Sequence, residues 1–405
     1  MIDIERIRRA YSRFLVPGRI LLSGHSHQAW PDVAREAQLE AFDDSARYVD
    51  EKWEHAVLPL VETVGRGVLK RQGFPEDDSI AFAESTHALL VRLFGALEAE
   101  GGSIVTTTGE FHSIDRQVRR YAEDGRRVHW VPASPRLGLA ERLVDAVRKA
   151  AADGPVVAAF SAVLFEDSWV LTEVGAILSE CHDLGVTVVV DAYHAFNAVP
   201  LAWGPAAGSA FVVGGGYKYA GFGNGLCWMR IPTDCALRPR DTGWFADFAS
   251  LAEPREAAGA AVLRPVRYAS GGARFAGATF EASGFYRARA VLRHWDELGL
   301  GVAELRAISL RQTRRVLDGL RGRGVLGEGK PLALGSDDDD ARRGAFVSVV
   351  HPEAGALSAK LRQLGILTDS RGERLRLGPA PYVLDAEIDT ALDVLATLVA
   401  PTGNR

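Results

Sequence analysis

The sequence contains few cysteines, little net charge and no long apolar run. Its three cysteines, Cys181, Cys227 and Cys235, cannot all pair with one another and form no close C-x-x-C pair, which favours a reducing cytoplasm. A net charge of -5 is too mild to indicate a nucleic acid or an anionic membrane as partner. No run of 18 apolar residues occurs, and the charged N-terminus MIDIERIRRAYSRF has no apolar signal core, so we expect no transmembrane helix.

What remains is the pattern of a globular α/β protein. A chain of 405 residues, 47% of them hydrophobic, suits a large domain with a sizeable core and a smaller second domain. Helices with apolar residues every three or four positions alternate with short apolar strands, which indicates a mainly parallel sheet sandwiched by helices. The expected strands lie within residues 77–85, 101–111, 155–165 and 186–191, and the expected helices include residues 54–72, 85–100, 173–185 and 287–299.

The alternation weakens in the second half of the chain, where we expect a smaller α+β C-terminal domain. A long helix over about 302–323 precedes the acidic stretch SDDDD at 336–340, which we expect to be an exposed loop, and AFVSVVHP then indicates a strand. The expected division is an N-terminal segment, 1–40, that packs on the small domain and the active site, a large domain, 41–285, and a small domain, 286–405.

Two stretches end in residues that belong in a reaction site. VVVDAYHAFNAVPL places Asp191 and His194 after one apolar run, and FVVGGGYKYAGFGNG places Lys218 after the next, 27 positions beyond Asp191. Ligands of open parallel sheets bind beyond the carboxyl ends of the strands, so neighbouring strands would bring the carboxylate and the amine to one rim. The glycines let the backbone pass close to a bulky ligand.

An aspartate and a lysine at the same rim indicate a carbonyl cofactor more strongly than either residue does alone. A lysine can form a Schiff base with an aldehyde, and an aspartate can keep a pyridine nitrogen protonated. Ser85 and Thr86, at the start of a helix, offer hydroxyls and a helix N-terminus for a phosphate. A lone aspartate is ordinarily a cap, a lone lysine is ordinarily solvated, and GGGYKYAG lacks the spacing of a nucleotide loop. We therefore expect a pyridoxal phosphate site.

Several motifs resemble the fold-type I pyridoxal-phosphate enzymes of the class V aminotransferase group, and among them kynureninase. VVVDAYHAFNAVPL resembles the family's D-x-x-H region, and GGGYKYAGFGNG resembles the region of its lysine. The resemblance covers most of the chain, and its other carriers are SGHSHQAWP at 23–31, ESTHALL at 84–90, GEFHSIDRQV at 109–118, TGWFAD at 242–247 and GILTDSRGERLRLGPAPY at 365–382.

The resemblance implies a role for each matching residue. Lys218, Asp191 and Tyr217 would be catalytic, and Arg376 would bind the substrate carboxylate, with Arg374 as runner-up on the same side of the strand. His25 and Trp30 would also touch the substrate, and no metal is implied. A homodimer with shared active sites is implied, in which Trp244 and Thr279 reach the neighbouring subunit's cofactor. The implied cofactor contacts are Ser85, Thr86, His87, Phe111, Asp191, His194, Tyr217, Lys218, Trp244 and Thr279.

The departures from the family fall mainly on the side of the substrate. The family's F-P-[ST]-D is here Phe111-His112-Ser113-Ile114, with Asp115 one place late, so either His112 or Asp115 could replace the cofactor-contacting aspartate. His25 stands for the usual asparagine, and GATFEAS at 277–283 replaces the proline-containing segment that touches an aromatic substrate. In addition, Phe165 stands where tyrosine is frequent and Asp247 where the family has histidine.

The function that these residues predict is cleavage of an amino acid by a pyridoxal-phosphate enzyme. We expect a kynureninase-like hydrolase that cleaves the β–γ carbon–carbon bond of kynurenine or a ring-modified relative, giving L-alanine and an anthranilate. A C–S lyase or desulfurase, a class V aminotransferase acting on another amino acid, and a non-catalytic protein that keeps the fold for binding are the alternatives. A desulfurase needs a mobile nucleophilic cysteine, whereas Cys227 lies in apolar GLCWMRI and Cys235 follows the lysine closely.

Overall fold

The large sheet explains how the two strand ends come together. The computed structural model describes residues 3–98, 101–252 and 265–400, and within these ranges the large sheet has seven strands in the order β2-β8-β7-β6-β5-β3-β4. Every neighbouring pair is parallel except β7–β8 and β2–β8, so β8 alone runs against the others. The strands are β2 (Ser79–Ala83), β3 (Ser103–Thr107), β4 (Val128–Val131), β5 (Val156–Ser161), β6 (Thr187–Asp191), β7 (Ala210–Gly215) and β8 (Cys227–Ile231).

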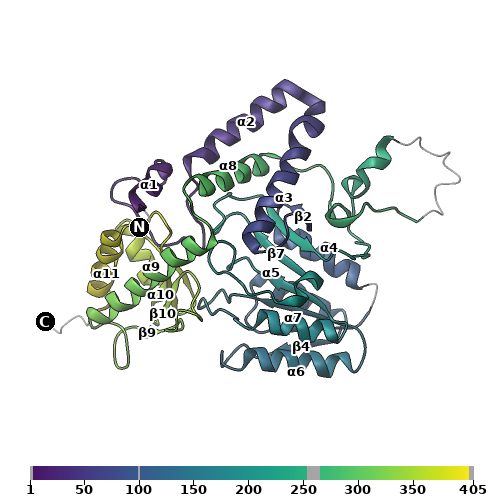
Figure 1. The fold of residues 1–405 in the computed structure, drawn as a ribbon. Coiled ribbons are helices and arrows are strands. Elements are labelled where there is room, and N and C mark those ends of the chain that lie inside the picture. The colour runs from purple at the N-terminus through teal and green to yellow at the C-terminus, as the bar shows by residue number, and fades with distance from the viewer. Residues whose placement is uncertain (1–2, 99–100, 253–264, 401–405) are drawn as a thin grey trace.

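Helices cover both faces of this sheet, as the apolar strands predict. Side chains alternate across a strand, and Val188 and Val190 of β6 pack in one core cluster while Val189 packs in another. The first cluster includes α6 (Leu139–Ala151) and α7 (Val174–Asp183), and the second includes α4 (Thr86–Glu98) and α5 (His112–Glu123). The chain therefore forms a three-layer α/β sandwich (Figure 1).

A smaller sheet forms a second centre of the fold near the C-terminus. Its order is β12-β13-β10-β9, and every neighbouring pair is antiparallel. The N-terminal segment joins this part of the chain, because β1 pairs in parallel with β11. These strands are β1 (Ile20–Leu21), β9 (Ala333–Leu334), β10 (Val347–Val350), β11 (Ile366–Leu367), β12 (Asp369–Arg371) and β13 (Arg374–Leu377), and the helices around them are α1 (Ile4–Arg8), α9 (Val302–Gly322), α10 (Ala354–Gln363) and α11 (Asp385–Val399).

Three further helices connect the two sheets. α2 (Asp32–Tyr48) and α3 (Leu58–Gln72) pack against α8 (Ser283–Glu297), and all three contribute to one large core cluster (Figure 1). The domain limits expected at residues 40 and 285 fall inside α2 and α8, and they stay a prediction. Over the part of the chain that the structure describes, none of the helices is long and apolar enough to span a membrane.

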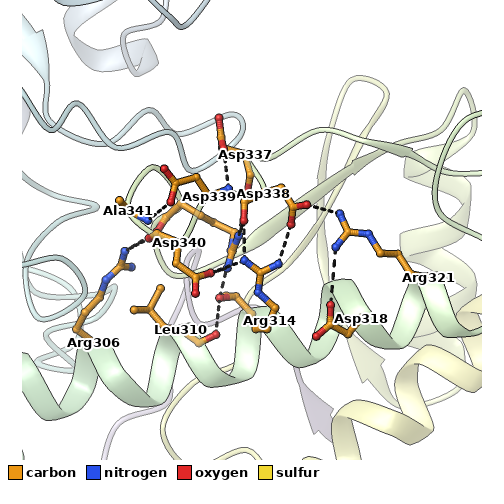
Figure 2. A network of polar contacts seen from close by, with 12 residues as sticks. Arg306, Leu310, Arg314, Asp318, Arg321, Asp337, Asp338, Asp339, Asp340 and Ala341 are labelled. Atoms are coloured by element: carbon orange, nitrogen blue, oxygen red, sulfur yellow. Dashed lines mark hydrogen bonds and ion pairs between the residues drawn. The ribbon is translucent and has the colours of Figure 1, made fainter.

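The acidic stretch at 336–340 is less isolated than the sequence suggests. Asp338 and Asp339 are exposed, as expected, but arginines of α9 reach across to the loop (Figure 2). Arg314 donates to Asp338 Oδ1 at 2.8 Å and to Asp340 Oδ1 at 2.7 Å. Arg343, which is 0% exposed, donates to the carbonyls of Asp337 and Asp338 and pairs with Asp340.

The same loop connects the small sheet to the segment between β5 and α7. Ser336 Oγ donates to the carbonyl of Asp167 at 2.7 Å, and the backbone N–H of Gly344 donates to the carbonyl of Ser168 at 2.7 Å. Arg342 forms an ion pair with Glu173 just before α7. These contacts of Ser336, Arg342 and Gly344 form a seam between the two sheets, and the acidic loop is part of it.

We predict that Arg343→Met lowers the free energy of unfolding by about 2 kcal/mol, because it removes a buried guanidinium and leaves the partly buried carbonyls of Asp337 and Asp338 without their donor. Arg321→Met is the matched control, since Arg321 pairs with Asp318 and Asp338 at a side chain that is 38% exposed, and it should cost less than about 1 kcal/mol. Chemical unfolding of both variants measures the difference. Equal losses would contradict the role given to the buried guanidinium.

Candidate functional site

The parallel pairing of β6 and β7 brings the two motifs to one rim. Asp191 ends β6 with Val213 of β7 as its register partner, and Lys218 follows three residues after the end of β7. The glycines between them are needed for space, because a Cβ on Gly215 would lie 2.4 Å from the Tyr193 hydroxyl. Asp191 and Lys218 line one cavity of about 370 Å³ at the carboxyl ends of the strands.

Lys218 is a buried amine with a histidine neighbour. Its side chain is 6% exposed, and Nζ lies 2.8 Å from Nε2 of His194. The rings of Phe111 and Tyr193 stand 5.1 Å and 4.7 Å from Nζ. Burial lowers the pKa of Lys218 to about 7, although the charge of Asp191 acts in the opposite direction. The amine therefore exists partly in its neutral, nucleophilic form near neutral pH.

Asp191 and His194 line the same cavity as the amine. Burial raises the pKa of Asp191, while a hydrogen bond from the backbone N–H of Tyr193 at 2.8 Å and the charge of Lys218 hold it down. Burial and then the charge of Lys218 keep the pKa of His194 well below its usual value. His194 is therefore a neutral imidazole near pH 7, and its Nδ1 has no hydrogen-bond partner within the described residues.

The first turn of α4 faces the same cavity. Ser85, Thr86 and His87 all line it, and Ser85 Oγ accepts a hydrogen bond from the backbone N–H of Ala88 at 3.2 Å. A helix N-terminus with hydroxyl groups is a favourable site for a phosphate. The structure thus places the expected phosphate contacts beside the expected lysine and aspartate.

Aromatic rings close the remaining walls. Phe111 and Phe165 meet edge to face with ring centres 5.4 Å apart, and both line the cavity. Tyr217 lines it as well and stacks on His27, with ring centres 4.9 Å apart. Burial raises the pKa of Tyr217, so its hydroxyl keeps its proton at neutral pH.

His112 and Asp115 were the two candidates to replace the family's cofactor-contacting aspartate. Neither of them lines the cavity. Asp115 pairs with Arg119 one turn along α5, with Nε 2.9 Å from Oδ2. His112 is exposed and packs against Phe165. Ser113 lines the cavity instead, and the buried carboxyl nearby belongs to Glu110.

Arg376, unlike Arg374, contacts a residue of the cavity wall, Phe165. Arg376 is 3% exposed, donates to the carbonyl of Phe165 at 2.5 Å and pairs with Asp369. Its charge also lowers the pKa of Lys218. Arg374 donates to the carbonyl of Gly335 instead. The structure therefore favours Arg376 over Arg374 as the guanidinium beside the cavity.

The remaining expected substrate and interface residues lie outside the cavity wall. His25 is fully buried, stacks on Phe346 at 4.5 Å and lies 3.8 Å from Asp369, which places it beside Arg376. Trp30 packs under Gly223, where a Cβ would lie 2.5 Å from the indole, so it supports the loop after Lys218. Trp244 is 38% exposed and Thr279 is also exposed.

Sequence reasoning missed several residues that the structure adds to the site, Ser113 among them. His27, Ser161 and Asn224 line the cavity, and Tyr193 packs on Lys218. His27 and Asn224 stand inside the quoted motifs SGHSHQAWP and GGGYKYAGFGNG, so their position was the available signal. Within the described ranges, histidine, cysteine and carboxylate side chains form no cluster of three or more that could hold a metal ion.

Comparison of the sequence with known proteins finds similarity to kynureninases. Residues 305–395, which include Arg376, match the family model of the kynureninase C-terminal domain. The chain is 25% identical to kynureninase of Pseudomonas fluorescens over 96% of its length and 91% of that protein. It is 28% identical to kynureninase of Deinococcus radiodurans over 55% of its length, a match that spans only 52% of that relative.

The chain is a kynureninase-like protein. Solved structures show that its fold is the fold-type I arrangement shared with cysteine desulfurases. The kynureninase-like chain superposes on the cysteine desulfurase of Thermococcus onnurineus NA1 with a TM-score of 0.76 at 18% identity, covering 98% of each chain. The cysteine desulfurase CsdA of Escherichia coli gives 0.79 at 14% identity, covering 98% of this chain and 99% of that one. A variant of the C–S lyase C-DES that carries glycine linked to its pyridoxal phosphate gives 0.79 at 18% identity, covering 96% and 98%.

We predict that Lys218 of the kynureninase-like chain reacts with a small aldehyde with a pH midpoint near 7, because its buried amine loses its proton there. Exposed Lys149 and Lys360 in the same digest serve as the comparison. Asp191→Asn should move the Lys218 midpoint to lower pH, since the charge of Asp191 raises it. Borohydride trapping and peptide mass spectrometry across pH give the midpoints, and a shared midpoint for all three lysines would contradict this account.

Proposed function

We propose that the chain is a pyridoxal-phosphate enzyme that hydrolyses the β–γ carbon–carbon bond of kynurenine or a ring-modified relative, releasing L-alanine and an anthranilate. The observation that carries the proposal is the buried Lys218 amine, which lies 2.8 Å from His194 in a cavity that Asp191 and the start of α4 also line. The match of residues 305–395 to the kynureninase C-terminal domain supports this reaction over the others that the fold supports.

The side chains present fit a pyridoxal phosphate. The cavity of about 370 Å³ offers Lys218 for the aldehyde, Asp191 for the ring nitrogen and Ser85 and Thr86 for the phosphate. Phe111 stands on the same wall as the expected ring contact. The unpartnered Nδ1 of His194 is a buried polar atom for which a ligand could supply a hydrogen bond. When bound, the cofactor supplies an aldehyde for amines and a ring that withdraws electrons from bonds at the α-carbon.

Lys218 would move the proton at the α-carbon. Its pKa of about 7 matches the requirement for a general base that works near neutral pH. His194 at 2.8 Å holds the amine in place and can share its proton. Asp191, which receives the hydrogen bond of the Tyr193 backbone, would remain anionic beside a protonated ring nitrogen.

Two residues would orient the substrate. Arg376 presents a planar guanidinium for the α-carboxylate, and its present bond to Asp369 fixes the orientation of that group. Tyr217, whose pKa is raised by burial, carries a proton that it can donate to a carbonyl oxygen of the substrate. The stacked His27 keeps the tyrosine ring in place and gives the cavity a flat aromatic wall.

The cysteines favour carbon–carbon cleavage over a desulfurase. Cys227 lines the cavity but belongs to β8, is 4% exposed and contacts the Tyr193 hydroxyl at 3.9 Å. Burial raises its pKa to about 11, so it is a poor nucleophile. Cys235 lines a different depression, beside Pro232 and Leu237. A C–S lyase without a cysteine nucleophile and an aminotransferase remain the second candidates, because they use the same lysine and aspartate. We expect all of these reactions to take place in the cytoplasm.

We predict that purified protein supplied with pyridoxal phosphate releases L-alanine and an anthranilate from kynurenine or a hydroxylated kynurenine. Lys218→Ala should lower kcat at least about a thousandfold, because general-base and covalent roles are lost together. Chromatography of the amino-acid products measures the reaction. Release of pyruvate and sulfide from cysteine, with all kynurenines untouched, would assign the chain to the C–S lyases instead.

In the same assay, Arg376→Lys tests the proposed carboxylate contact, and Arg374→Lys is its matched control. Both residues lie on β13, but only Arg376 reaches the carbonyl of Phe165 on the cavity wall. Lysine cannot replace a bidentate guanidinium, so Arg376→Lys should raise KM for the amino acid about tenfold to a hundredfold, and Arg374→Lys should leave it nearly unchanged. A reversed pattern would exchange their assignments.

We predict a homodimer of twice 43.7 kDa in which Trp244 of one subunit completes the site of the other. Trp244→Ala and Lys218→Ala homodimers should each lose activity. Their co-expression should restore roughly a quarter of the wild-type activity, because each mixed dimer regains one complete site. Light scattering gives the mass and the mixed preparation gives the rescue. A monomer, or a mixed dimer without rescue, would contradict the shared site.

A further inference from the structure

A buried carboxyl group lies directly behind the cavity wall, and the roles above do not use it. Glu110 is 4% exposed and stands between β3 and α5, one residue before Phe111. Thr107 Oγ1 donates to Glu110 Oε1 at 2.5 Å, and Ser161 Oγ donates to Glu110 Oε2 at 2.5 Å. The backbone N–H of Ser161 adds a hydrogen bond to the same carboxyl. Glu110 thus connects the ends of β3 and β5.

Ser161 links this carboxyl to the cavity. It is 5% exposed, it lines the cavity, and its register partner on β6 is Asp191. Register partners on neighbouring strands point to the same face of the sheet, so Ser161 and Asp191 stand side by side in the cavity wall. A serine hydroxyl has one proton to donate and lone pairs to accept with, and the partner on one side fixes what it offers on the other.

We propose that Glu110 is a positioning residue whose protonation decides whether the Ser161 hydroxyl presents a lone pair or a proton to the cavity beside Asp191. Ionised Glu110 can only accept, so Ser161 donates to it and turns its lone pairs to the cavity. Protonated Glu110 can donate to Ser161, which releases the hydroxyl proton toward a ring atom. The proposal rests on the proposed function, because the ligand beside Asp191 is taken to be the pyridine ring.

The surrounding charges place this switch near neutral pH. Burial raises the pKa of Glu110 to about 7, since its hydrogen bonds offset the burial only in part, and the Asp191 carboxylate on β6 raises it further. The contacts from β3 and β5, Thr107 and Ser161, are neutral hydroxyls, and Lys218 after β7 offsets the charge of Asp191. Because the folded pKa is raised, the stability that Glu110 contributes is complete below its unfolded pKa and is lost as the pH rises through about 7.

The first experiment uses the cofactor-free protein. Infrared difference spectra should show a carboxylic acid band that disappears near pH 7 in the wild type and is missing in Glu110→Gln. Removal of the hydroxyl in Ser161→Ala should move that midpoint upward, because the carboxylate loses a hydrogen-bond donor. The melting-temperature advantage of the wild type over Glu110→Gln should shrink as the pH rises from about 5 to about 8. A Glu110 band that is already lost at about pH 4.5 would overturn the proposal.

The second experiment titrates the visible absorption of the protein loaded with pyridoxal phosphate. Glu110→Gln should lower the pH midpoint of the absorption change by about one unit. The glutamine amide can donate to Ser161 Oγ, so the Ser161 hydroxyl donates its own proton to the cavity. The same substitution in a Ser161→Ala background should give little shift. An equal shift in both backgrounds would overturn the proposal, since the charge would then act without the hydroxyl.

Two comparisons separate this inference from the proposed function and from general damage. Glu123→Gln, an exposed carboxyl on α5, should leave both midpoints unchanged. Thr107→Val removes the other hydroxyl but keeps Ser161. Its infrared midpoint should rise, and adding Ser161→Ala should still move that midpoint. The two ideas can fail separately. If the infrared midpoint lies near 7 and moves in Ser161→Ala, but the protein takes up no pyridoxal phosphate, the hydrogen-bond switch is supported and the proposed function is contradicted.

Discussion

The site depends on the burial of one amine among groups that do not fully neutralise it. Lys218 is 6% exposed and meets a neutral imidazole at 2.8 Å rather than a carboxylate. Water would hold such an amine protonated, whereas burial, together with the charge of Arg376, brings its pKa to about 7. The sheet produces this environment, because the parallel pairing of β6 and β7 places Asp191 and Lys218 on one rim. The glycines before Lys218 then bring the backbone against Tyr193 and Cys227.

The seam between the two sheets completes the site from the other side. Arg376 reaches from β13 of the small sheet to the carbonyl of Phe165, whose ring lines the cavity. The loop after Phe165 is held by Ser336 and Gly344, close to the arginine-bound acidic stretch. Arg376 and the cavity wall therefore depend on the same seam.

The sequence predicted the parts of the site that follow from strand order, and it missed the contacts made across the chain. Apolar strands followed by D-x-x-H and Y-K gave Asp191, His194 and Lys218 because parallel strands end on one edge. Periodicity alone could not place Trp30 under Gly223, since that contact joins segments nearly 200 positions apart. Glu110 was missed because a carboxylate in a turn is ordinarily solvated, and only Thr107 and Ser161 from two strands make it a buried acid.

The central claim is that Lys218 is the residue that holds a pyridoxal phosphate. The most direct test is borohydride reduction of protein purified with this cofactor, followed by mass spectrometry of its peptides. The account predicts a phosphopyridoxyl group on Lys218 and its absence in Lys218→Ala. A label on another lysine, or no label in protein that is otherwise folded, would contradict it.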